Sequence, residues 1–222
     1  MEKGNKEILL EAGLALGISL GEREMSLFAS YLEDLLRWNS RMNLTALKSE
    51  RDIIIKHFID SLTLLPYIRN KSGRVLDIGS GAGFPGIPLK IAVDSLSVFL
   101  LEASRKKSSF LKNVVRALNL KETVVINSRA ESMMEDSAYE GFFNIVTSRA
   151  AIKLPPLLRM GAFFLTPSGS LLIMKGKRTD KELSEARDVP QNLGLKYSES
   201  HDLTLPITDD FRRIFVFKKL AS

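Results

Sequence analysis

The chain lacks cysteine altogether and has only two histidines among its 222 residues. Without cysteine it can form neither disulfide bonds nor thiolate metal sites, and we expect it to bind no metal. A cysteine nucleophile is also missing, so covalent attack on a pyrimidine carbon by such a group is excluded. Histidine chemistry is limited to two positions, His57 and His201.

Long hydrophobic runs are also missing. No window approaches the roughly 18 uninterrupted apolar residues that a transmembrane helix needs. The first residues, MEKGNKEILLEAG, lack the apolar run and the small-residue cleavage site of a signal peptide. We therefore expect a cytoplasmic protein without membrane contacts. The sequence carries no signal for oligomeric state, and a monomer is the expectation.

Acidic residues are fewer than basic ones, and the net charge is +6. Residues 1–71 hold 10 Lys and Arg against 10 Asp and Glu, whereas residues 152–222 hold 12 against 8. A basic surface in the C-terminal part can attract a polyanion such as RNA. A solvated Lys-rich surface would give the same composition, and charge alone favours that simpler interpretation.

The hydrophobic pattern divides the chain into two parts, residues 1–71 and residues 72–222. The first part reads as an all-helical extension with helices at 5–17, 21–42 and Asp52–Ile68, the last turn of which Pro66 should disturb. In the second part short apolar runs alternate with amphipathic helices, which predicts crossover units and a doubly wound, mostly parallel sheet. We therefore expect an α/β, Rossmann-like domain after the extension.

Seven strands and four helices are predicted for the second part. The strands are Arg74–Ile78, Ser97–Leu101, Thr123–Asn127, Phe143–Thr147, Ser170–Met174, Lys196–Leu203 and Arg213–Lys218, the last two forming an antiparallel pair. The helices are Pro85–Val93, Ser104–Leu118, Leu154–Phe164 and the polar segment Asp180–Asn192.

The stretch VLDIGSGAGFPGIPL runs from the first predicted strand through a glycine-rich loop into the next predicted helix. It contains Gly81-x-Gly83-x-x-Gly86, the spacing of a dinucleotide-binding loop, which is weak as a lone signal and can also mark a tight turn. The next strand ends in Glu102, where a carboxylate can accept hydrogen bonds from both hydroxyls of a ribose. NAD and S-adenosylmethionine both carry that ribose, so Glu102 supports an adenosine ligand without choosing between them.

Asp77 favours one of the two cofactors. It lies inside an apolar strand, two residues before Gly79, where an unpaired carboxylate would be costly. A pyrophosphate would be repelled there, whereas the ammonium and sulfonium groups of S-adenosylmethionine would be attracted. Asp77 could also simply accept backbone N–H groups and brace the turn. The pattern therefore favours a methyltransferase over a dehydrogenase. A Walker-type phosphate loop is excluded, because Gly176-Lys177 is followed by Arg178.

The acceptor chemistry is narrowed by what the strand-end loops lack. The loop after the fourth strand, Thr147-Ser148-Arg149-Ala150, has no Asn/Asp-Pro-Pro-aromatic motif of amino-methylating DNA enzymes. Both histidines are predicted outside the loops that form the cofactor cleft. Two kinds of methyl acceptor remain: an atom with a free lone pair, such as guanine N7, or an atom whose proton leaves to water. We therefore assign no catalytic side chain.

Arg149 stands at the carboxyl end of the fourth strand. There it could clamp the carboxylate of the cofactor or an RNA phosphate in bidentate fashion. It could equally be a surface arginine that braces its loop. The sequence does not decide between these roles.

At this point the chain resembles the bacterial 16S rRNA guanine-N7 methyltransferases. The resemblance runs through most of the chain and is most specific in the glycine loop, with its Phe-Pro-Gly-Ile-Pro ending, and in the run from Trp38 to Thr45. The matching segments are Arg37-Trp38-Asn39, Asn43-Leu44-Thr45, His57-Phe58-Ile59-Asp60-Ser61, Asp77 to Gly86, Ser128-Arg129-Ala130-Glu131, Ser148-Arg149-Ala150, Lys175-Gly176 and Arg212-Arg213.

The resemblance implies a class I S-adenosylmethionine-dependent enzyme that methylates N7 of one guanosine in a loop of 16S rRNA near the decoding site. Its partner would be the rRNA, the small ribosomal subunit or an assembly intermediate. It also implies cofactor contacts at Gly79, Phe84, Ala130, Glu131 and Arg149, to which Glu102 is added on the ribose argument.

Other polar residues have two interpretations. Trp38, Asn43 and His57 could line the substrate approach, but a structural role is favoured for each: core packing, a helix cap or turn, and a hydrogen bond to the sheet domain. As RNA phosphate contacts we predict Lys175, Lys177, Arg178, Arg212 and Arg213. A dinucleotide oxidoreductase and a non-catalytic RNA-binding module remain the alternative hypotheses.

Overall fold

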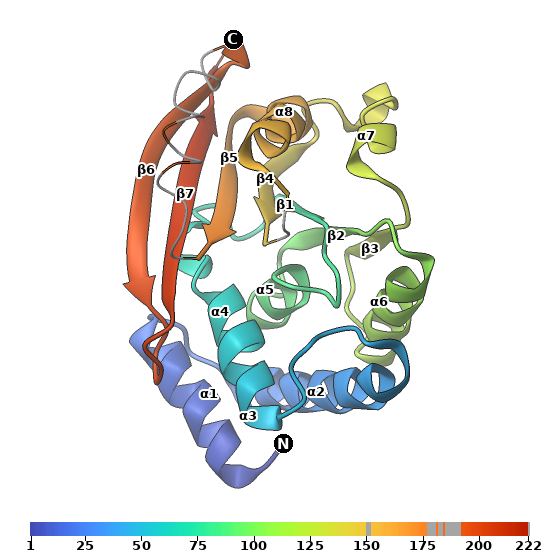
Figure 1. Ribbon diagram of the computed structural model, residues 1–222, viewed down its shortest axis with the longest axis vertical. Helices are drawn as coiled ribbons and strands as arrows, with labels where there is room; N and C mark the ends of the chain where they lie inside the picture. Colours follow the sequence, from blue (N-terminus) through green and yellow to red (C-terminus); the bar gives the residue numbers. More distant parts are fainter. Residues whose placement is uncertain (150–151, 177–180, 182–183, 185–191, 222) are drawn as a thin grey trace.

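One sheet of seven strands forms the centre of the protein (Figure 1). The computed structural model describes residues 1–149, 152–176, 181, 184 and 192–221. The strands are β1 (Arg74–Ile78), β2 (Ser97–Leu101), β3 (Thr123–Ile126), β4 (Phe143–Ser148), β5 (Leu165–Lys175), β6 (Leu195–Thr204) and β7 (Phe211–Lys219). Their order is β3-β2-β1-β4-β5-β7-β6; β1 to β5 pair in parallel, and β7 is antiparallel to both neighbours. The predicted sheet, including its antiparallel C-terminal strand, is confirmed.

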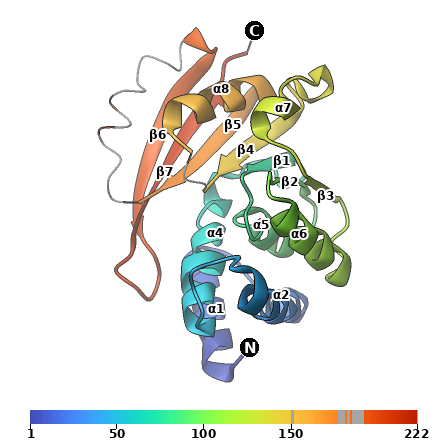
Figure 2. The same ribbon diagram turned by 45° about the vertical axis from the view of Figure 1, so that its right-hand side comes forward.

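The sheet has a separate hydrophobic core on each face, because side chains alternate between the faces of a strand. Val75 packs into one core and Leu76 into the other, and Leu100 and Leu101 divide in the same way. Helices lie on both faces (Figure 2): α5 (Gly86–Ala92) and α6 (Arg105–Ala117) on the first, α7 (Ala130–Met133) and α8 (Leu154–Phe164) on the second. The predicted polar helix Asp180–Asn192 lies mostly outside the described residues.

Strand β5 is longer than the Ser170–Met174 segment predicted for it. The residues Pro167-Ser168-Gly169 read as a break, but the strand continues through them as a bulge. Ser168 takes a positive φ of 62°, and the register with β4 shifts between Phe143 and Ile145. A bulge absorbs turn-forming residues without ending the strand, which explains why the sequence pattern misplaced its start.

The N-terminal extension consists of helices that precede β1. They are α1 (Lys3–Ala15), α2 (Glu22–Met42), α3 (Glu50–Ile53), a π-helical segment (Ile54–Ile59), α4 (Asp60–Leu62) and a 3₁₀ turn (Leu65–Tyr67). The predicted single helix Asp52–Ile68 is therefore wrong in detail, because its middle is π-helical and it ends at Leu62. The predicted disturbance by Pro66 is confirmed, since this proline lies in the separate 3₁₀ turn.

The extension packs on the α5 and α6 side of the sheet (Figure 1). Helix α2 contacts both α5 and α6, and α4 contacts α5. One continuous core runs from Leu9 in α1 to Val216 in β7. The division into an extension of residues 1–71 and a domain of residues 72–222 stays a prediction, since both parts contribute to this core.

Candidate active site

The glycine loop lies between β1 and α5, at the carboxyl edge of the sheet, where open α/β sheets bind ligands. Gly79, Gly81 and Gly83 all have positive φ, of 71°, 61° and 100°, so the turn requires glycine there. A side chain at Gly83 would also clash, because its Cβ would lie 2.7 Å from the Tyr31 hydroxyl. That hydroxyl donates to Ala82 O at 2.5 Å, so α2 of the extension holds the loop from below.

Asp77 is fully buried beneath this loop. Its Oδ2 accepts a hydrogen bond from Gly86 N at 3.0 Å, which confirms the predicted bracing role. Its Oδ1 has no partner in the described part of the chain, and neither does the buried hydroxyl of Thr147, its register neighbour on β4. Burial raises the pKa of the Asp77 carboxyl to about 7. Buried polar atoms without partners are rare in proteins, and these two belong to paired residues of adjacent strands.

Glu102 fastens the glycine loop to the end of β2. Its Oε2 accepts from Gly81 N at 2.8 Å and its Oε1 from Ser104 N at 2.7 Å. A carboxylate oxygen has two lone pairs, so each oxygen can accept one further hydrogen bond. The predicted ribose contact of Glu102 stays a prediction. The structure adds that the carboxylate already shapes the loop.

Three adjoining cavities open along this edge. An apolar cavity of about 360 Å³ is lined by Gly79, Ala130 and Glu131, together with Leu101 and Met160. A second, which we call the loop hollow, has about 150 Å³ and lies over the glycine loop; its walls include Gly79, Phe84, Thr45, His57 and Arg149. The third, the basic hollow, has about 390 Å³, and its walls include Thr45, Lys56, His57, Arg149, Lys175 and Arg212.

The cavities are joined by shared wall residues. Gly79 belongs to the apolar cavity and to the loop hollow. Thr45, His57 and Arg149 belong to the loop hollow and to the basic hollow. All the predicted cofactor-binding residues line this series of cavities except Glu102, whose carboxylate instead binds the glycine loop at Gly81. A larger hollow of about 560 Å³ lies at the opposite edge, beside the amino ends of β4 and β5, away from the glycine loop.

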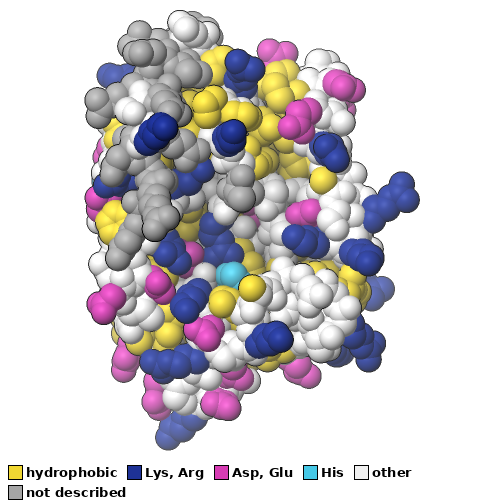
Figure 3. All heavy atoms as spheres, viewed as in Figure 1, with side chains coloured by type: hydrophobic (Ala, Val, Ile, Leu, Met, Phe, Trp, Pro, Cys, Tyr) yellow, Lys and Arg dark blue, Asp and Glu magenta, His cyan; other side chains and the backbone are white. Residues whose placement is uncertain are grey.

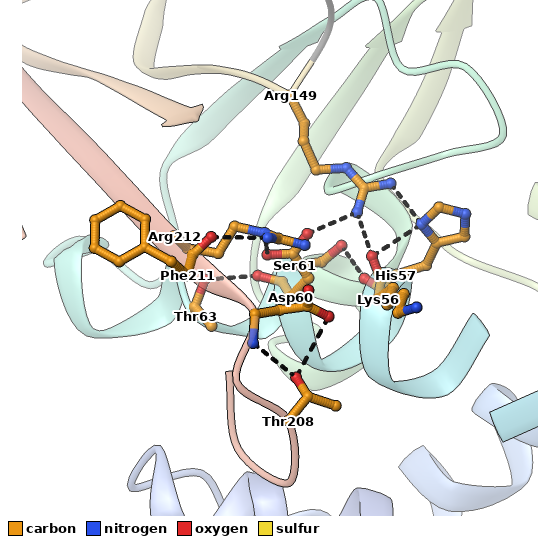
Figure 4. Close-up of polar contacts among 10 residues, drawn as sticks. Lys56, His57, Asp60, Ser61, Thr63, Arg149, Thr208, Phe211 and Arg212 are labelled. Carbon is orange, nitrogen blue, oxygen red and sulfur yellow. Dashed lines mark hydrogen bonds and ion pairs between the residues drawn. The ribbon is translucent and has the colours of Figure 1, made fainter. Parts of the chain in front are cut away.

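Asp60 joins two arginines in the wall of the basic hollow (Figure 4). This buried carboxylate, from α4, binds Arg149 Nη1 through Oδ2 at 3.1 Å and Arg212 Nε through Oδ1 at 2.9 Å. Arg149 Nη1 also donates to Lys56 O at 2.9 Å. Arg149 thus connects the end of β4 to the extension and not to its own loop, and its predicted cofactor contact stays a prediction.

His57 is outside the strand-end loops, as predicted, but it lines the loop hollow and the basic hollow from the extension, so its exclusion from the site was wrong. The π-helical segment of the extension carries the ring over the glycine loop, where it stacks on Phe84 with centroids 4.4 Å apart. Nδ1 is 2.9 Å from Arg149 Nη2, and Nε2 is 2.7 Å from Thr45 Oγ1. Burial, with the charge of Arg149, lowers the pKa of His57 to about 3. The strand-end argument could not find His57, because it excluded the extension; the His57–Ser61 motif and the less favoured role of lining the substrate approach pointed there.

The other candidates of the extension have the structural roles that were favoured. Trp38 packs edge-on against Phe110 of α6, with centroids 5.7 Å apart, and Asn43 caps the C-terminus of α2 with a φ of 49°. Neither lines the three cavities. Asp60, Thr45 and Tyr31 were missed as site residues, although the first two lie within the motifs that carry the family resemblance.

Two of the predicted RNA-contacting cations, Lys175 and Arg212, line the basic hollow. On the face seen in Figure 3, Lys and Arg side chains surround a histidine near the middle of the molecule. Arg213 instead forms a bidentate ion pair with Asp202 of β6, at 2.5 and 2.7 Å. Lys177 and Arg178 lie outside the described residues, as does Ala150.

The described ranges offer neither a metal site nor a membrane span. There, no group of three or more His, Cys, Asp or Glu side chains could hold a metal ion. The helices of the same ranges are all too short or too polar to cross a membrane.

The fold is similar to that of two solved proteins of the same architecture. It matches TYW2 of M. jannaschii in complex with AdoMet with a TM-score of 0.59 at 14% identity, over 79% of this chain and 80% of that one. It matches the fibrillarin pre-rRNA processing protein of Methanococcus jannaschii with a TM-score of 0.54 at 15% identity, over 69% of each chain. At such identities the likeness concerns the fold alone, and that fold is the Rossmann-like α/β fold of class I methyltransferases.

Sequence relatives narrow the class to one family. Residues 24–207 match the family described as rRNA small subunit methyltransferase G. The ribosomal RNA small subunit methyltransferase G of Syntrophus aciditrophicus is 46% identical over 213 residues, covering 96% of this chain and 88% of the relative. That of Geotalea uraniireducens is 36% identical over 221 residues and covers both chains entirely. The chain belongs to the rRNA small subunit methyltransferase G family, which confirms the resemblance and the methyltransferase predicted from the sequence.

Proposed function

We propose that this protein uses S-adenosylmethionine to methylate N7 of a single guanosine in 16S rRNA, and that it does so without a general base. The observation that carries the proposal is the row of three cavities, which share walls and have the glycine loop at their centre. A row of this kind can hold a cofactor at one end and an acceptor nucleotide at the other, with the loop between them.

The residues of the first two cavities fit the cofactor. Leu101 and Met160 offer apolar walls to an adenine, and Ala130 and Glu131 offer backbone groups and a carboxylate to its edge. Glu102 has acceptor capacity left for ribose hydroxyls, and the unpartnered Oδ1 of Asp77 favours a cationic amino-acid moiety. When bound, S-adenosylmethionine supplies a methyl group activated by the sulfonium; the protein supplies position.

The basic hollow fits an RNA acceptor. Lys56, Lys175 and Arg212 place positive charge around it, and a phosphodiester needs such partners for positioning. The extension supplies Thr45, His57 and Asp60 to this hollow, so we propose that residues 1–71 complete the substrate side of the domain formed by residues 72–222.

The titratable groups of the basic hollow favour a methyl acceptor atom that carries no proton and therefore needs no base. With a pKa near 3, His57 is too weak a base to remove a proton from an amine or a hydroxyl at neutral pH. Asp60 is engaged with two arginines. Guanine N7 has a free lone pair and requires no deprotonation, and direct in-line transfer to it suits these surroundings.

Incubation with isotope-labelled cofactor and small ribosomal subunits tests the proposal, with naked 16S rRNA and assembly intermediates as further substrates. We expect label on one guanosine as 7-methylguanosine. The absence of label on every one of these substrates would overturn the proposal. Calorimetric titration separates the alternatives: binding of S-adenosylmethionine supports it, and tight binding of NAD alone would indicate an oxidoreductase. Because its proposed substrate is ribosomal RNA, we propose that the protein acts in the cytoplasm. We also propose that it is a monomer.

A further inference from the structure

The protonation of His57 can be read from its neighbours. Arg149 Nη2 lies 2.9 Å from Nδ1, and a guanidinium can only donate hydrogen bonds. Nδ1 must therefore be the unprotonated acceptor. The Lys56 carbonyl oxygen is 3.0 Å from the same nitrogen and accepts from Arg149 Nη1 at 2.9 Å, but it can accept two hydrogen bonds, so it does not decide the tautomer; the guanidinium contact does. The neutral ring consequently carries its proton on Nε2.

This protonation fixes the direction of the next hydrogen bond. Nε2 lies 2.7 Å from the Thr45 hydroxyl oxygen, so Nε2–H donates to it. The backbone N–H of Leu47 donates to the same oxygen at 3.2 Å. Both lone pairs of the hydroxyl are then occupied, and only its proton remains available. Within the described part of the chain no acceptor takes that proton.

Thr45 stands where an acceptor atom of a substrate would arrive. It lines both the loop hollow and the basic hollow, and with His57 and Arg149 it forms the boundary between them. On the proposed function, this boundary separates the methyl donor from the acceptor nucleotide. A base that presents its N7 toward the loop hollow must bring the neighbouring exocyclic group into the same region.

We infer that Thr45 is a specificity-determining residue whose hydroxyl donates a hydrogen bond to O6 of the target guanine. Guanine carries two acceptors on this edge, N7 and O6, whereas adenine has an amino donor in place of O6. A hydroxyl restricted to donation accepts guanine and opposes adenine. Arg149 and His57 act behind it as positioning residues, since they restrict the hydroxyl to donation. This inference rests on the proposed function and names the group that selects the base.

The first measurement concerns the tautomer of His57 in the unsubstituted protein. The ¹⁵N and ¹H spectrum of the imidazole groups contains two rings, and a His57→Gln spectrum assigns them. We expect the Nε2–H tautomer for His57, unchanged between pH 5 and pH 8. A proton on Nδ1 would overturn the inference, because the Thr45 hydroxyl would then donate to the ring.

The second measurement compares variants on small subunits with an unmethylated target. Thr45→Val should lower kcat/KM between about 10- and 100-fold, while the Kd for S-adenosylmethionine changes less than about threefold. Thr45→Ser should restore most of the rate. Thr123→Val, the same chemical change on edge strand β3, is the matched control and should match the unsubstituted protein.

The third measurement removes the partner atom instead. Subunits reconstituted with 2-aminopurine at the target keep N7 but lack O6. On these subunits kcat/KM of the unsubstituted protein should fall by a similar factor. The kcat/KM of Thr45→Val should fall little further, because both changes delete the same hydrogen bond. Independent, multiplying losses would overturn the inference. If the unsubstituted protein transfers no methyl group to guanosine, the proposed function has failed instead.

Discussion

Arg149 donates to Nδ1 of His57 across 2.9 Å, a hydrogen bond between the end of β4 and the π-helical segment of the extension. The two residues lie 92 positions apart in the chain. Their contact closes the boundary between the loop hollow and the basic hollow, and it keeps a positive charge beside an imidazole. Both the stability and the pH response of the site follow from this arrangement.

The Asp60 carboxylate should be among the most sensitive single positions of the fold. In Asp60→Asn, Arg149 and Arg212 lose their common buried partner, and we expect the free energy of unfolding to fall by about 3 kcal/mol. Urea denaturation measures it. Asp202→Asn is the matched control, since it breaks the more exposed pair with Arg213 and should cost less than about 1 kcal/mol. Equal losses in the two variants would contradict the role given to Asp60.

The lowered pKa of His57 predicts a pH-dependent contribution to stability. In the unfolded chain the ring has a pKa near 6.5 and binds a proton below that pH. In the folded chain it stays neutral down to about pH 3. The stabilisation is complete above about pH 6.5 and declines as pH falls, by about 1.4 kcal/mol per unit. The difference in unfolding free energy between the unsubstituted protein and His57→Gln should follow this slope. His201→Gln is the control, and a parallel slope in both variants would contradict the prediction.

Asp77 has the opposite dependence. Its pKa is raised to about 7, so the unfolded chain releases the proton first, and this contribution to stability is lost as pH rises from about 4 to about 7. Asp77→Asn should therefore equal or exceed the unsubstituted protein in stability at pH 8, as measured by urea denaturation. Lower stability of the variant at that pH would argue against a strained carboxylate.

The same carboxylate should make cofactor binding depend on pH. A cationic ligand prefers the ionised form, so affinity for S-adenosylmethionine should rise roughly tenfold between pH 6 and pH 8 through Asp77. Calorimetry on Asp77→Asn isolates this effect, because the titration of the ligand itself remains in the variant. An identical pH profile in both proteins would exclude Asp77 as the group responsible.

Gly83 should tolerate no side chain. In Gly83→Ala the new Cβ would lie 2.4 Å from Ile87 Cδ1 and 2.7 Å from the Tyr31 hydroxyl, at a φ of 100°. We expect a loss of about 2–4 kcal/mol in unfolding free energy and weakened cofactor binding. Gly4→Ala in α1, where a Cβ meets nothing within 4 Å, should instead stabilise slightly, by about 0.5 kcal/mol. Thermal unfolding and calorimetry of the two variants provide the comparison.

Much of the sheet could be predicted because its signals are local. The strands Arg74–Ile78 and Ser97–Leu101 were predicted with the bounds that the structure has, since each is a short apolar run between polar turns. The glycine loop was found for the same reason. The bulge in β5 was missed because Pro167-Ser168-Gly169 has the composition of a turn and only pairing with β4 keeps it in the strand.

The substrate side of the site could not be predicted in the same way. Asp60 contacts Arg149 and Arg212, which are 89 and 152 positions away, and no periodicity encodes such a meeting. His57 reaches the cleft through the packing of the extension on α5. Thr45 follows the C-cap of α2, and the role proposed for its hydroxyl depends on the contact with the His57 ring. These are tertiary contacts, and in the sequence the motifs of the family resemblance were what indicated them.

The aromatic contacts between Tyr31, Phe58 and Phe84 link the extension to the glycine loop, and the Tyr31 hydroxyl completes the link at Ala82. A consequence concerns how such proteins diverge. The space that Gly83 leaves empty is the space that Tyr31 fills, so neither position can change size alone. A replacement extension would therefore have to present a side chain of matching size at the position of Tyr31.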